Sequence, residues 1–458
     1  MRKNLKFFAF KNVIKKKSKM SEQNKIPTSK VARASQVFRT SMKVGANYIK
    51  HSAQKAINKD VSEDVLNDKN AEELFKLMSQ LKGSALKIAQ LVSMDNGLLP
   101  KQFAEKFAKA QNSAMALSTP LVINTFKKYV GKHPNELFDT FNLNAVHSAS
   151  IGQVHEATKD GKKLAVKLQY PGVADSIHSD LNMVKPIFLR FIGVKENAVK
   201  HYFDEFEERL VEECDYDLEL KNAIEISEFT KHIPNLIIPK YYKNLSGKKI
   251  LTMDWIDGIS LSTYIETEKN QDKKNQLAQT LIDFLFCQIH EHQCFHADPH
   301  PGNFLVTKNN ELVVLDFGCV KRIPKDFYTN YFLLSKKEVR NDKSKFIDVL
   351  KNLDILRDGD SEVEYKLFYE TALNAVELIS YPTQFESFYY GDKAYNQKLQ
   401  TQGEAIFNNK EFRKPNSIRG SKHAIYLHRA FFGVFSILHR LDATVKMDNS
   451  FMEKLKFQ

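Results

Sequence analysis

Apolar residues recur at helical spacing through the first third of the chain. Between residues 70 and 92 they are separated by three or four positions, which places them on one face of a helix; they are Leu74, Met78, Leu81, Ala85, Ile88 and Val92. Thr119-Pro120 and Pro134 are typical of the first turns of two further helices, because a first turn tolerates a missing N–H. The pattern predicts a helical extension over residues 27–143.

The pattern changes near residue 144 to short apolar runs that are typical of strands. Residues 146–158 and 163–169 flank Asp160-Gly161, a dipeptide that strongly favours a hairpin turn. Between these strands and the next ones, the sequence predicts a helix over residues 173–192 and one long acidic helix over residues 202–231. Two more strands are predicted after the acidic helix, at Leu236–Lys240 and Lys249–Met253.

A second hairpin pattern lies further along the chain. Phe304–Val306 and residues 312–315 are apolar runs on either side of a turn-like Lys308-Asn309-Asn310. After this hairpin the sequence is polar and helical to its end, apart from a loop predicted at Tyr389–Asp392. A strand-containing part followed by a mostly helical part predicts an α+β fold.

Composition restricts the class of protein. Hydrophobic residues make up 42% of the 458 positions, enough for a large core. No apolar run approaches eighteen residues, so no transmembrane segment is predicted. The four cysteines show no C-x-x-C spacing, which favours free thiols in a reducing, cytoplasmic compartment over a zinc site or a disulfide framework.

The N-terminus carries much of the net charge of +13. Eight basic residues precede the first acid, with Phe7, Phe8 and Phe10 among them; they are Arg2, Lys3, Lys6, Lys11, Lys15, Lys16, Lys17 and Lys19. Such a stretch can contact anionic lipid at a membrane surface or nucleic acid, or can serve as a targeting peptide. We favour a disordered tail over residues 1–26, or an upstream start before a true start at Met20. No nucleic-acid motif occurs elsewhere, so nucleic acid is not expected as a partner.

The strongest chemical signal is the stretch from His296 to Gly318. Asp298 and Asn303 have the spacing of the kinase catalytic loop D-x-x-x-x-N, and Asp316 begins a D-F-G after the second hairpin. Any single aspartate near a turn is more often a cap or a solvated residue. The ordered set instead favours a nucleotide site, with one carboxylate to take a proton and with Asn303 and Asp316 as ligands of Mg²⁺.

The first hairpin carries matching features. Leu164-Ala165-Val166-Lys167 fits the V-A-I-K pattern, and Lys167 is a candidate catalytic residue that also binds the nucleotide phosphates. The preceding strand matches the glycine-rich pattern G-x-G-x-x-G-x-V only at its third glycine, but its position makes it the candidate phosphate-covering loop; the candidate contacts are Ala149, Ser150, Gly152, Gln153 and Val154. Residues 251–256 predict a strand and hinge, which makes Met253 and Trp255 nucleotide contacts. The lysine needs a carboxylate partner, and Asp215 and Glu219 lie four apart on the acidic helix.

These motifs together resemble the UbiB/AarF/ADCK family of atypical kinases over residues 79–320. The resemblance rests on Lys87-Ile88-Ala89-Gln90, residues 148–155, Ala165-Val166-Lys167, Glu213-Cys214-Asp215-Tyr216, residues 296–303 and Asp316-Phe317-Gly318. An alanine-rich phosphate loop is a trait of that family. Two positions depart from the family pattern, namely Ala89 where glycine is usual and His147 where alanine is usual.

The resemblance implies a protein-kinase-like, two-lobed fold with an N-terminal helical extension. We divide the chain into a tail (1–26), the extension (27–143), an N-lobe (144–256) and a C-lobe (257–458). The cofactors implied are ATP and Mg²⁺, with Lys167 paired to Glu219. Lys87 and Gln90 would lie at the nucleotide and, with Glu213 and Asp215, would occlude the space for a peptide substrate.

The resemblance further implies an ATP-dependent kinase or ATPase linked to quinone biosynthesis or lipid homeostasis. Its expected partners are a lipid, a small molecule of a quinone pathway or a protein complex, with peripheral membrane contact. Two alternatives remain open: a nucleotide-sensing pseudokinase scaffold, and a small-molecule phosphotransferase of the aminoglycoside or choline type, which shares the His-x-Asp loop. The Lys87–Gln90 helix and the alanine-rich loop favour the first reading.

Overall fold

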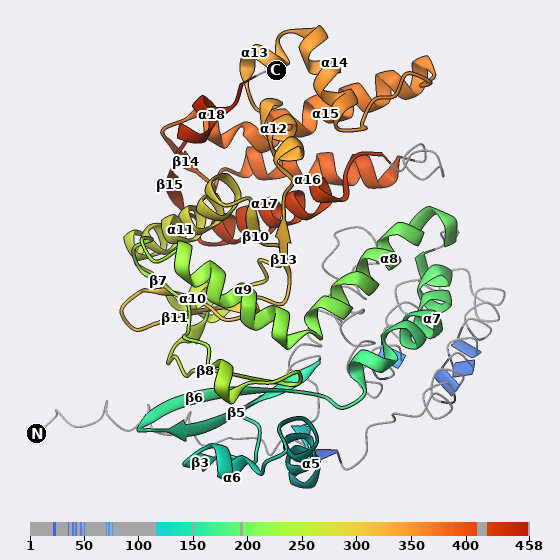
Figure 1. Ribbon diagram of the computed structural model, residues 1–458. Coiled ribbons are helices and arrows are strands. Elements are labelled where there is room, and N and C mark those ends of the chain that lie inside the picture. The colour runs from blue at the N-terminus through green and yellow to red at the C-terminus, as the bar shows by residue number, and fades with distance from the viewer. Residues whose placement is uncertain are drawn as a thin grey trace, which may run out of the picture.

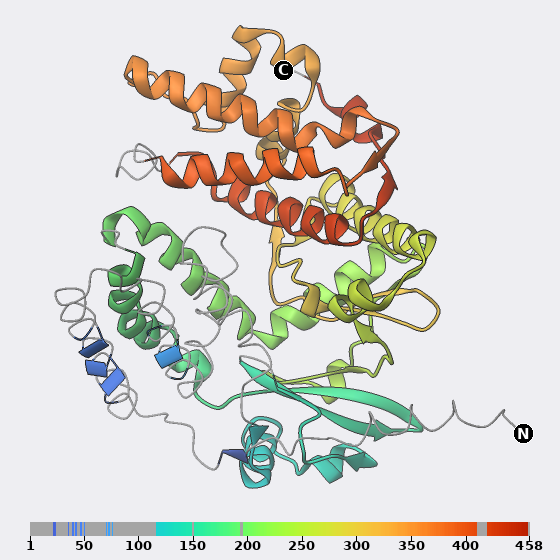
Figure 2. The same cartoon turned by 180° about the vertical axis from the view of Figure 1, so that it is seen from behind.

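The computed structural model describes residues 116–148, 151–192, 196–409 and 419–456, together with residues 22–23 and single positions between 35 and 76 (Figure 1). A five-stranded sheet lies at one end of the molecule and a group of helices at the other, with α9 and short strands between them (Figures 1 and 2). Strands and helices are segregated along the chain, which confirms the predicted α+β, two-lobed fold. In the predicted extension, the described positions from 35 to 76 are helical.

The five-stranded sheet is built around the predicted first hairpin. The strand order is β3-β5-β6-β8, with β4 also paired to β5. Its strands are β3 Thr140–Phe141, β4 His147–Ser148, β5 Gly152–Lys159, β6 Lys162–Gln169 and β8 Ile250–Asp254. Asp160 and Gly161 both have positive φ, 50° and 74°, as the predicted hairpin turn requires. The register pairs Val154 with Lys167, so these two side chains lie on the same face of the sheet.

Two short helices cover the other face of this sheet. They are α5 Thr119–Val130 and α6 Pro134–Leu137, both close to their predicted positions. Phe126 of α5 packs edge-on against Phe138 and Phe141, and Phe141 stacks on His155 of β5. The parallel pair β1 Glu22–Gln23 and β2 Ala116–Leu117 lies before α5.

Three helices connect the sheet to the rest of the molecule: α7 Val173–Ile192, α8 Glu196–Glu213 and α9 Tyr216–Phe229. The prediction of one continuous acidic helix over residues 202–231 is wrong, because the chain breaks after Glu213. The Asp215 side chain accepts a hydrogen bond from the N–H of Leu218 and so caps the start of α9. The α8 and α9 ribbons consequently run in different directions (Figure 1).

The second hairpin organises a four-stranded sheet with the order β7-β12-β11-β9. Its strands are β7 Leu236–Ile237, β9 Ile259–Ser260, β11 Phe304–Val306 and β12 Leu312–Val314. The antiparallel pairing of β11 with β12 confirms the predicted hairpin. A further pair, β10 Cys294–His296 with β13 Val320–Arg322, brings the two ends of the His296–Gly318 stretch together.

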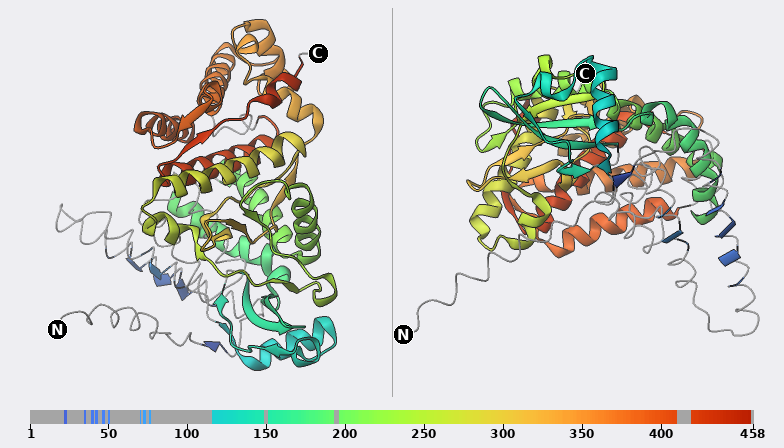
Figure 3. Two further views of the ribbon diagram at one scale, coloured as in Figure 1. Left: turned by 90° about the vertical axis from the view of Figure 1, so that its left-hand side faces the viewer. Right: turned by 90° about the horizontal axis from the view of Figure 1, so that it is seen from below.

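Helices form most of the remaining chain. They are α10 Leu261–Thr267, α11 Gln271–Phe286, the π-helical turn η3 Cys287–Glu291, α12 Lys325–Leu333, α13 Lys337–Arg340, α14 Lys343–Asn352, α15 Glu362–Ser380, α16 Lys393–Asn408, α17 Lys422–Arg440 and α18 Ser450–Lys454, with 3₁₀ turns η2 Lys243–Leu245, η4 Pro301–Asn303 and η5 Pro382–Gln384. Helices α11 and α17 lie side by side (Figure 3). None of the described helices is long and apolar enough to cross a membrane.

The loop predicted at Tyr389–Asp392 is only partly correct. Tyr389 ends strand β14 Ser387–Tyr389, which pairs antiparallel with β15 Thr444–Lys446. Phe388 is buried at the centre of this pair. A partner strand 55 or more positions later in the chain supplies the hydrogen bonds, so local composition gives no sign of the strand.

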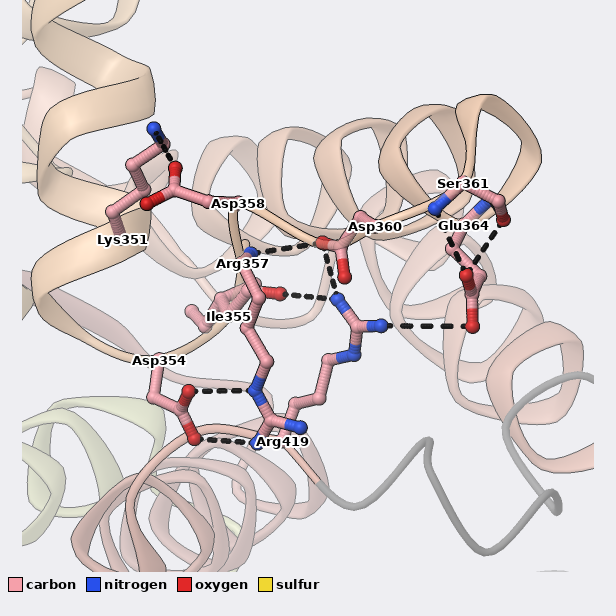
Figure 4. Close-up of polar contacts among 9 residues, drawn as sticks. All are labelled: Lys351, Asp354, Ile355, Arg357, Asp358, Asp360, Ser361, Glu364 and Arg419. Atoms are coloured by element: carbon pink, nitrogen blue, oxygen red, sulfur yellow. Dashed lines mark hydrogen bonds and ion pairs between the residues drawn. The ribbon is translucent and has the colours of Figure 1, made fainter.

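Buried charges fix the C-terminal helices together. Arg419, just before α17, forms an ion pair with Asp360 in the α14–α15 loop, and both side chains are only 5% exposed (Figure 4). The Arg419 guanidinium also lies 4.0 Å above the ring of Phe368 on α15. Because removing one member of a buried ion pair costs about 3–5 kcal/mol, this contact holds the start of α17 firmly against α15.

Candidate functional site

Lys167 lies at the centre of the candidate site, between two carboxylates. Its Nζ donates to Glu219 Oε1 and Oε2 at 2.9 and 3.0 Å, and to Asp316 Oδ2 at 2.9 Å. Lys167 comes from β6, Glu219 from the first turn of α9, and Asp316 from the segment after β12. The fold thus joins three segments that are far apart in the sequence, including both lobes, through one ammonium group.

The burial of this cluster controls its charges. Glu219 is 1% exposed, and its burial raises its pKa to about 7, helped by the nearby charge of Asp316 and opposed by Lys167. Burial alone would lower the pKa of Lys167, but the charges of Asp316 and Glu219 outweigh it and hold that pKa well above its usual value. Lys167 therefore remains a cation, while Glu219 is the group that titrates most easily.

The Glu219 carboxyl gives the fold a pH-dependent stability. Its pKa is higher in the folded chain, about 7, than the ordinary 4.5. Its contribution is therefore full below about pH 4.5 and is lost as the pH rises through about 7. We expect the free energy of unfolding of the wild type to fall over this range relative to that of Glu219→Gln, measured by urea denaturation. Glu228→Gln, an exposed change on the same helix, is the control, and parallel wild-type and Glu219→Gln profiles would contradict the assignment.

Asp298 is held from two sides. Asn303 Nδ2 donates to the Asp298 main-chain oxygen at 3.0 Å and to its Oδ2 at 3.3 Å. On the other side, the guanidinium of Arg209 from α8 lies 3.3 Å from Oδ1 and is only 1% exposed. The predicted meeting of Asp298 and Asn303 is thus present in the fold, and a buried arginine joins them.

The D-F-G segment is anchored through its backbone. The carbonyls of residues 315–317 each accept a hydrogen bond, from the hydroxyl of Tyr241 at 2.9 Å, from Nε2 of His296 at 2.6 Å and from the side-chain amide of Asn222 at 3.2 Å. Burial lowers the pKa of His296, so the imidazole is neutral and Nε2 carries its proton toward the carbonyl. Three separate elements therefore fix the position of Asp316.

The candidate phosphate loop is only partly described. Ala149 and Ser150 lie outside the described residues. Val154 lies on the face of the sheet that carries Lys167. Gln153 points to the opposite face, where its Oε1 accepts from the N–H of Leu117 at 2.7 Å and its Nε2 contacts the ring of His155 at 2.8 Å. The structure thus brings Val154, but not the Gln153 side chain, toward Lys167, because successive residues of a strand alternate between faces.

Gly152 occupies a position that has no room for a side chain. A Cβ there would lie 2.7 Å from the carbonyl oxygen of Leu168 and 3.0 Å from the hydroxyl of Tyr216. We expect Gly152→Ala to lower the free energy of unfolding by about 1–3 kcal/mol, because the strands must separate to relieve the overlap. Gly359→Ala, where nothing lies within 4 Å, should change it by less than about 0.5 kcal/mol. Equal midpoints of chemical denaturation for the two variants would show that the sheet absorbs the methyl group.

The two hinge candidates have different surroundings. Met253 is buried on β8 and pairs with Ala165, two residues from Lys167 and on the same face of the sheet. Trp255 follows β8; Lys163 Nζ lies 4.4 Å from its ring and its Nε1 donates to Asp257 at 2.9 Å. Met253 therefore shares the face of the sheet that carries Lys167, whereas the printed contacts of Trp255 are with Lys163 and Asp257.

Half of the proposed occluding set can be located. Lys87 and Gln90 lie outside the described residues. Glu213 ends α8 and is buried next to the D-F-G glycine, since a Cβ added to Gly318 would lie 3.5 Å from the Cα of Glu213. Asp215 is exposed and caps α9.

The side chains of the site fit magnesium and a nucleotide. Asp316, Asp298 and the Asn303 amide supply the hard oxygen donors that Mg²⁺ prefers. Asn303 uses its Nδ2 to bind Asp298, which leaves its amide oxygen as the ligating atom. Lys167 supplies a cation beside them for phosphate oxygens. The donor set therefore suits a hard divalent cation together with phosphates.

Several residues of the site were not predicted from the sequence. Arg209, Tyr241 and Asn222 belong to no motif and become neighbours of the site only through folding. His296 lies within a recognised motif, but its contact to the D-F-G backbone needs the pairing of β10 with β13. A single arginine between acidic residues of a helix carries no sign that it will be buried.

Comparisons with known proteins agree with this geometry. A family model described as the ABC1 atypical kinase-like domain matches residues 109–350. The probable serine/threonine-protein kinase abkA of Dictyostelium discoideum is 26% identical over 459 residues, covering 93% of this chain and 79% of that protein. The mitochondrial atypical kinase COQ8 of Saccharomyces cerevisiae is 26% identical over 448 residues, covering 94% of this chain and 86% of that protein.

A solved structure shares the fold. The structure described as the complex of Rv3197 with erythromycin from Mycobacterium tuberculosis has a TM-score of 0.58 and 25% sequence identity to this chain. The match covers 86% of this chain and 98% of that one. The likeness therefore extends over most of the length of both chains.

Proposed function

The chain belongs to the UbiB/AarF/ADCK family of atypical kinases, and from this premise we propose that it is a Mg-ATP-dependent phosphotransferase or ATPase. The observation that carries the proposal is the bridge from Lys167 to both Glu219 and Asp316, at 2.9 Å in each case. Such a bridge brings a phosphate-binding cation next to a metal-binding carboxylate. An isolated structural ion pair would need only one of the two acids.

Each residue has a distinct role in this proposal. Lys167 contacts the α- and β-phosphates, and Glu219 holds it in place. Asn303 and Asp316 hold Mg²⁺, which when bound neutralises charge on the phosphate oxygens. Asp298 accepts the proton of the attacking hydroxyl or water, while Arg209 and Asn303 fix its orientation. The loop residues Ala149, Ser150, Gly152 and Val154 cover the phosphates, with Met253 and Trp255 near the base.

The proposed substrates follow from the relatives. Proteins named COQ8 and COQ8B support a lipid or a quinone-pathway small molecule or protein complex as the partner. We propose that Lys87 and Gln90, with Glu213 and Asp215, restrict access by peptides. The location proposed is the cytoplasm or the surface of a membrane inside the cell; the COQ8 relatives carry the word mitochondrial in their names.

Phosphate release from ATP by the purified full chain tests the proposed function. We expect Mg²⁺-dependent turnover that rises when liposomes or candidate lipids are added. The Asp298→Asn variant, purified in the same way, controls for contaminating ATPases. Nucleotide binding without turnover above that control would favour the pseudokinase scaffold instead. Efficient phosphorylation of an aminoglycoside or choline would favour the small-molecule phosphotransferase.

A further inference from the structure

A cluster of three potential metal ligands lies on α9 and α11, away from the candidate nucleotide site. His232, Cys287 and Glu291 each offer one donor atom, and these three atoms lie within 4.8 Å of one another. No other group of three or more His, Cys, Asp or Glu side chains comes as close in the part of the chain that the structure describes. The cysteine spacing of the sequence gave no reason to expect a metal here.

The local backbone explains how the cluster forms. His232 lies in the turn that follows α9, while Cys287 and Glu291 are the first and last residues of the π-helical turn η3 at the end of α11. A π-helical turn is wider than an α-helical one and occurs frequently at functional sites. Phe229, the last residue of α9, stacks on His292 at a ring distance of 3.9 Å, which holds the two elements together. The ligands thus come from two packed and ordered elements.

The chemistry of the donors selects the metal. A thiolate, an imidazole and a carboxylate together are the ligand types of zinc, whereas magnesium prefers oxygen alone. Zinc binds sulfur at about 2.3 Å and nitrogen or oxygen at about 2.0–2.2 Å, so its ligand atoms lie roughly 3.5 Å apart. His232 and Glu291 are exposed and can rotate their side chains to approach that spacing. Cys287 is buried, 4% exposed, and needs no movement to face them.

We propose that His232, Cys287 and Glu291 bind one zinc ion, with water in the fourth position. On binding, the Cys287 thiol loses its proton to solvent as the sulfur–zinc bond forms. The ion ties the end of α9, the helix whose first turn carries Glu219, to the C-lobe helix α11. The proposal is independent of the function proposed above, because none of the three ligands belongs to the nucleotide site.

A simpler explanation of the cluster is that the thiol only caps α9. Cys287 Sγ lies 3.9 Å from the carbonyl oxygen of Phe229, a distance compatible with a weak hydrogen bond. In that case His232 and Glu291 are ordinary exposed residues near a buried cysteine. The two explanations differ in whether sulfur contacts a cation, which can be observed directly.

Cobalt(II) is the probe, because a cobalt–thiolate bond has an intense near-ultraviolet charge-transfer band. The full chain, stripped with a chelator, should bind Co²⁺ with this band at one equivalent, and Zn²⁺ should displace it. Cobalt at Asp316 and Asn303 would lack the band, since those ligands contain no sulfur. Cys287→Ala should abolish the band, and His232→Ala and Glu291→Gln, which change exposed side chains, should weaken cobalt binding at least tenfold.

Two matched variants complete the experiment. Cys294→Ala removes another buried thiol, and His292→Asn removes the neighbouring imidazole; both should retain the band at one equivalent. The proposal is overturned by cobalt binding without the thiolate band, or by a band that persists in Cys287→Ala. Unchanged affinity in both His232→Ala and Glu291→Gln would also overturn it.

Discussion

Replacing Asp298 with asparagine is expected to lower the turnover of ATP about 10²–10⁴-fold, the usual effect of losing a general base. The variant keeps the shape of the side chain and can still contact Asn303. Lys167, Glu219 and Asp316 are unchanged, so nucleotide binding should be retained. Phosphate release and a thermal-shift titration with Mg-ATP measure the two effects separately, and unchanged turnover in a pure preparation would exclude this role.

Arg209 makes a stability measurement necessary in the same experiment. In Asp298→Asn its buried guanidinium, 1% exposed, loses the carboxylate that lies 3.3 Å away. Leaving such a charge unpaired costs about 3–5 kcal/mol. We therefore expect Asp298→Asn to melt earlier than the wild type. The double variant Arg209→Met with Asp298→Asn should regain much of that stability without regaining turnover. Turnover that returned with stability would show that Asp298 matters only for folding.

Replacing Asp316 with asparagine is expected to remove the Mg²⁺-dependent part of nucleotide binding. In the wild type, Mg-ATP at a hundred times its Kd should stabilise the fold by about 2.7 kcal/mol. Asparagine keeps an oxygen for the Gly318 N–H, which donates to Asp316 Oδ1 at 2.9 Å, and Lys167 keeps its pairing with Glu219. The apo variant should thus remain folded, with a much smaller thermal shift on addition of Mg-ATP.

The control for this experiment is Asp326→Asn, an exposed change at the start of α12. It should show the wild-type shift. ATP in excess chelator should shift the wild type only weakly. A full shift that survives in Asp316→Asn, or an equal shift with and without Mg²⁺, would show that Asp316 is not a metal ligand.

The sequence predicts those parts of the fold and site that depend on local pattern. Both hairpins follow from alternating apolar runs around turn residues, and Asp160-Gly161 adopts the backbone that its sequence favours. Lys167, Asp298, Asn303 and Asp316 are recognised by spacing alone, because each precedes or follows a strand at a fixed interval. Their proximity then follows from the pairing of those strands.

Other features depend on contacts that spacing does not encode. The break before α9 was missed because Asp215 is one acid among many, and only its hydrogen bond to Leu218 marks it as a cap. Gln153 was grouped with Val154 although neighbouring strand residues face opposite ways. The burial of Arg209 follows from the packing of α8 against the loop at Asp298, which no local pattern reveals.

The anchoring of the D-F-G backbone has a consequence for inhibitors. Some ligands of kinase-like proteins need the phenylalanine of this motif to leave the core. Here Phe317 is 0% exposed, and the carbonyls of residues 315–317 are held by Tyr241, His296 and Asn222. Moving the ring would break about three hydrogen bonds worth about 0.5–1.5 kcal/mol each and expose a side chain worth about 1.5–3 kcal/mol. Compounds that bind beside a stationary Phe317 should therefore bind this protein more tightly than compounds that displace it.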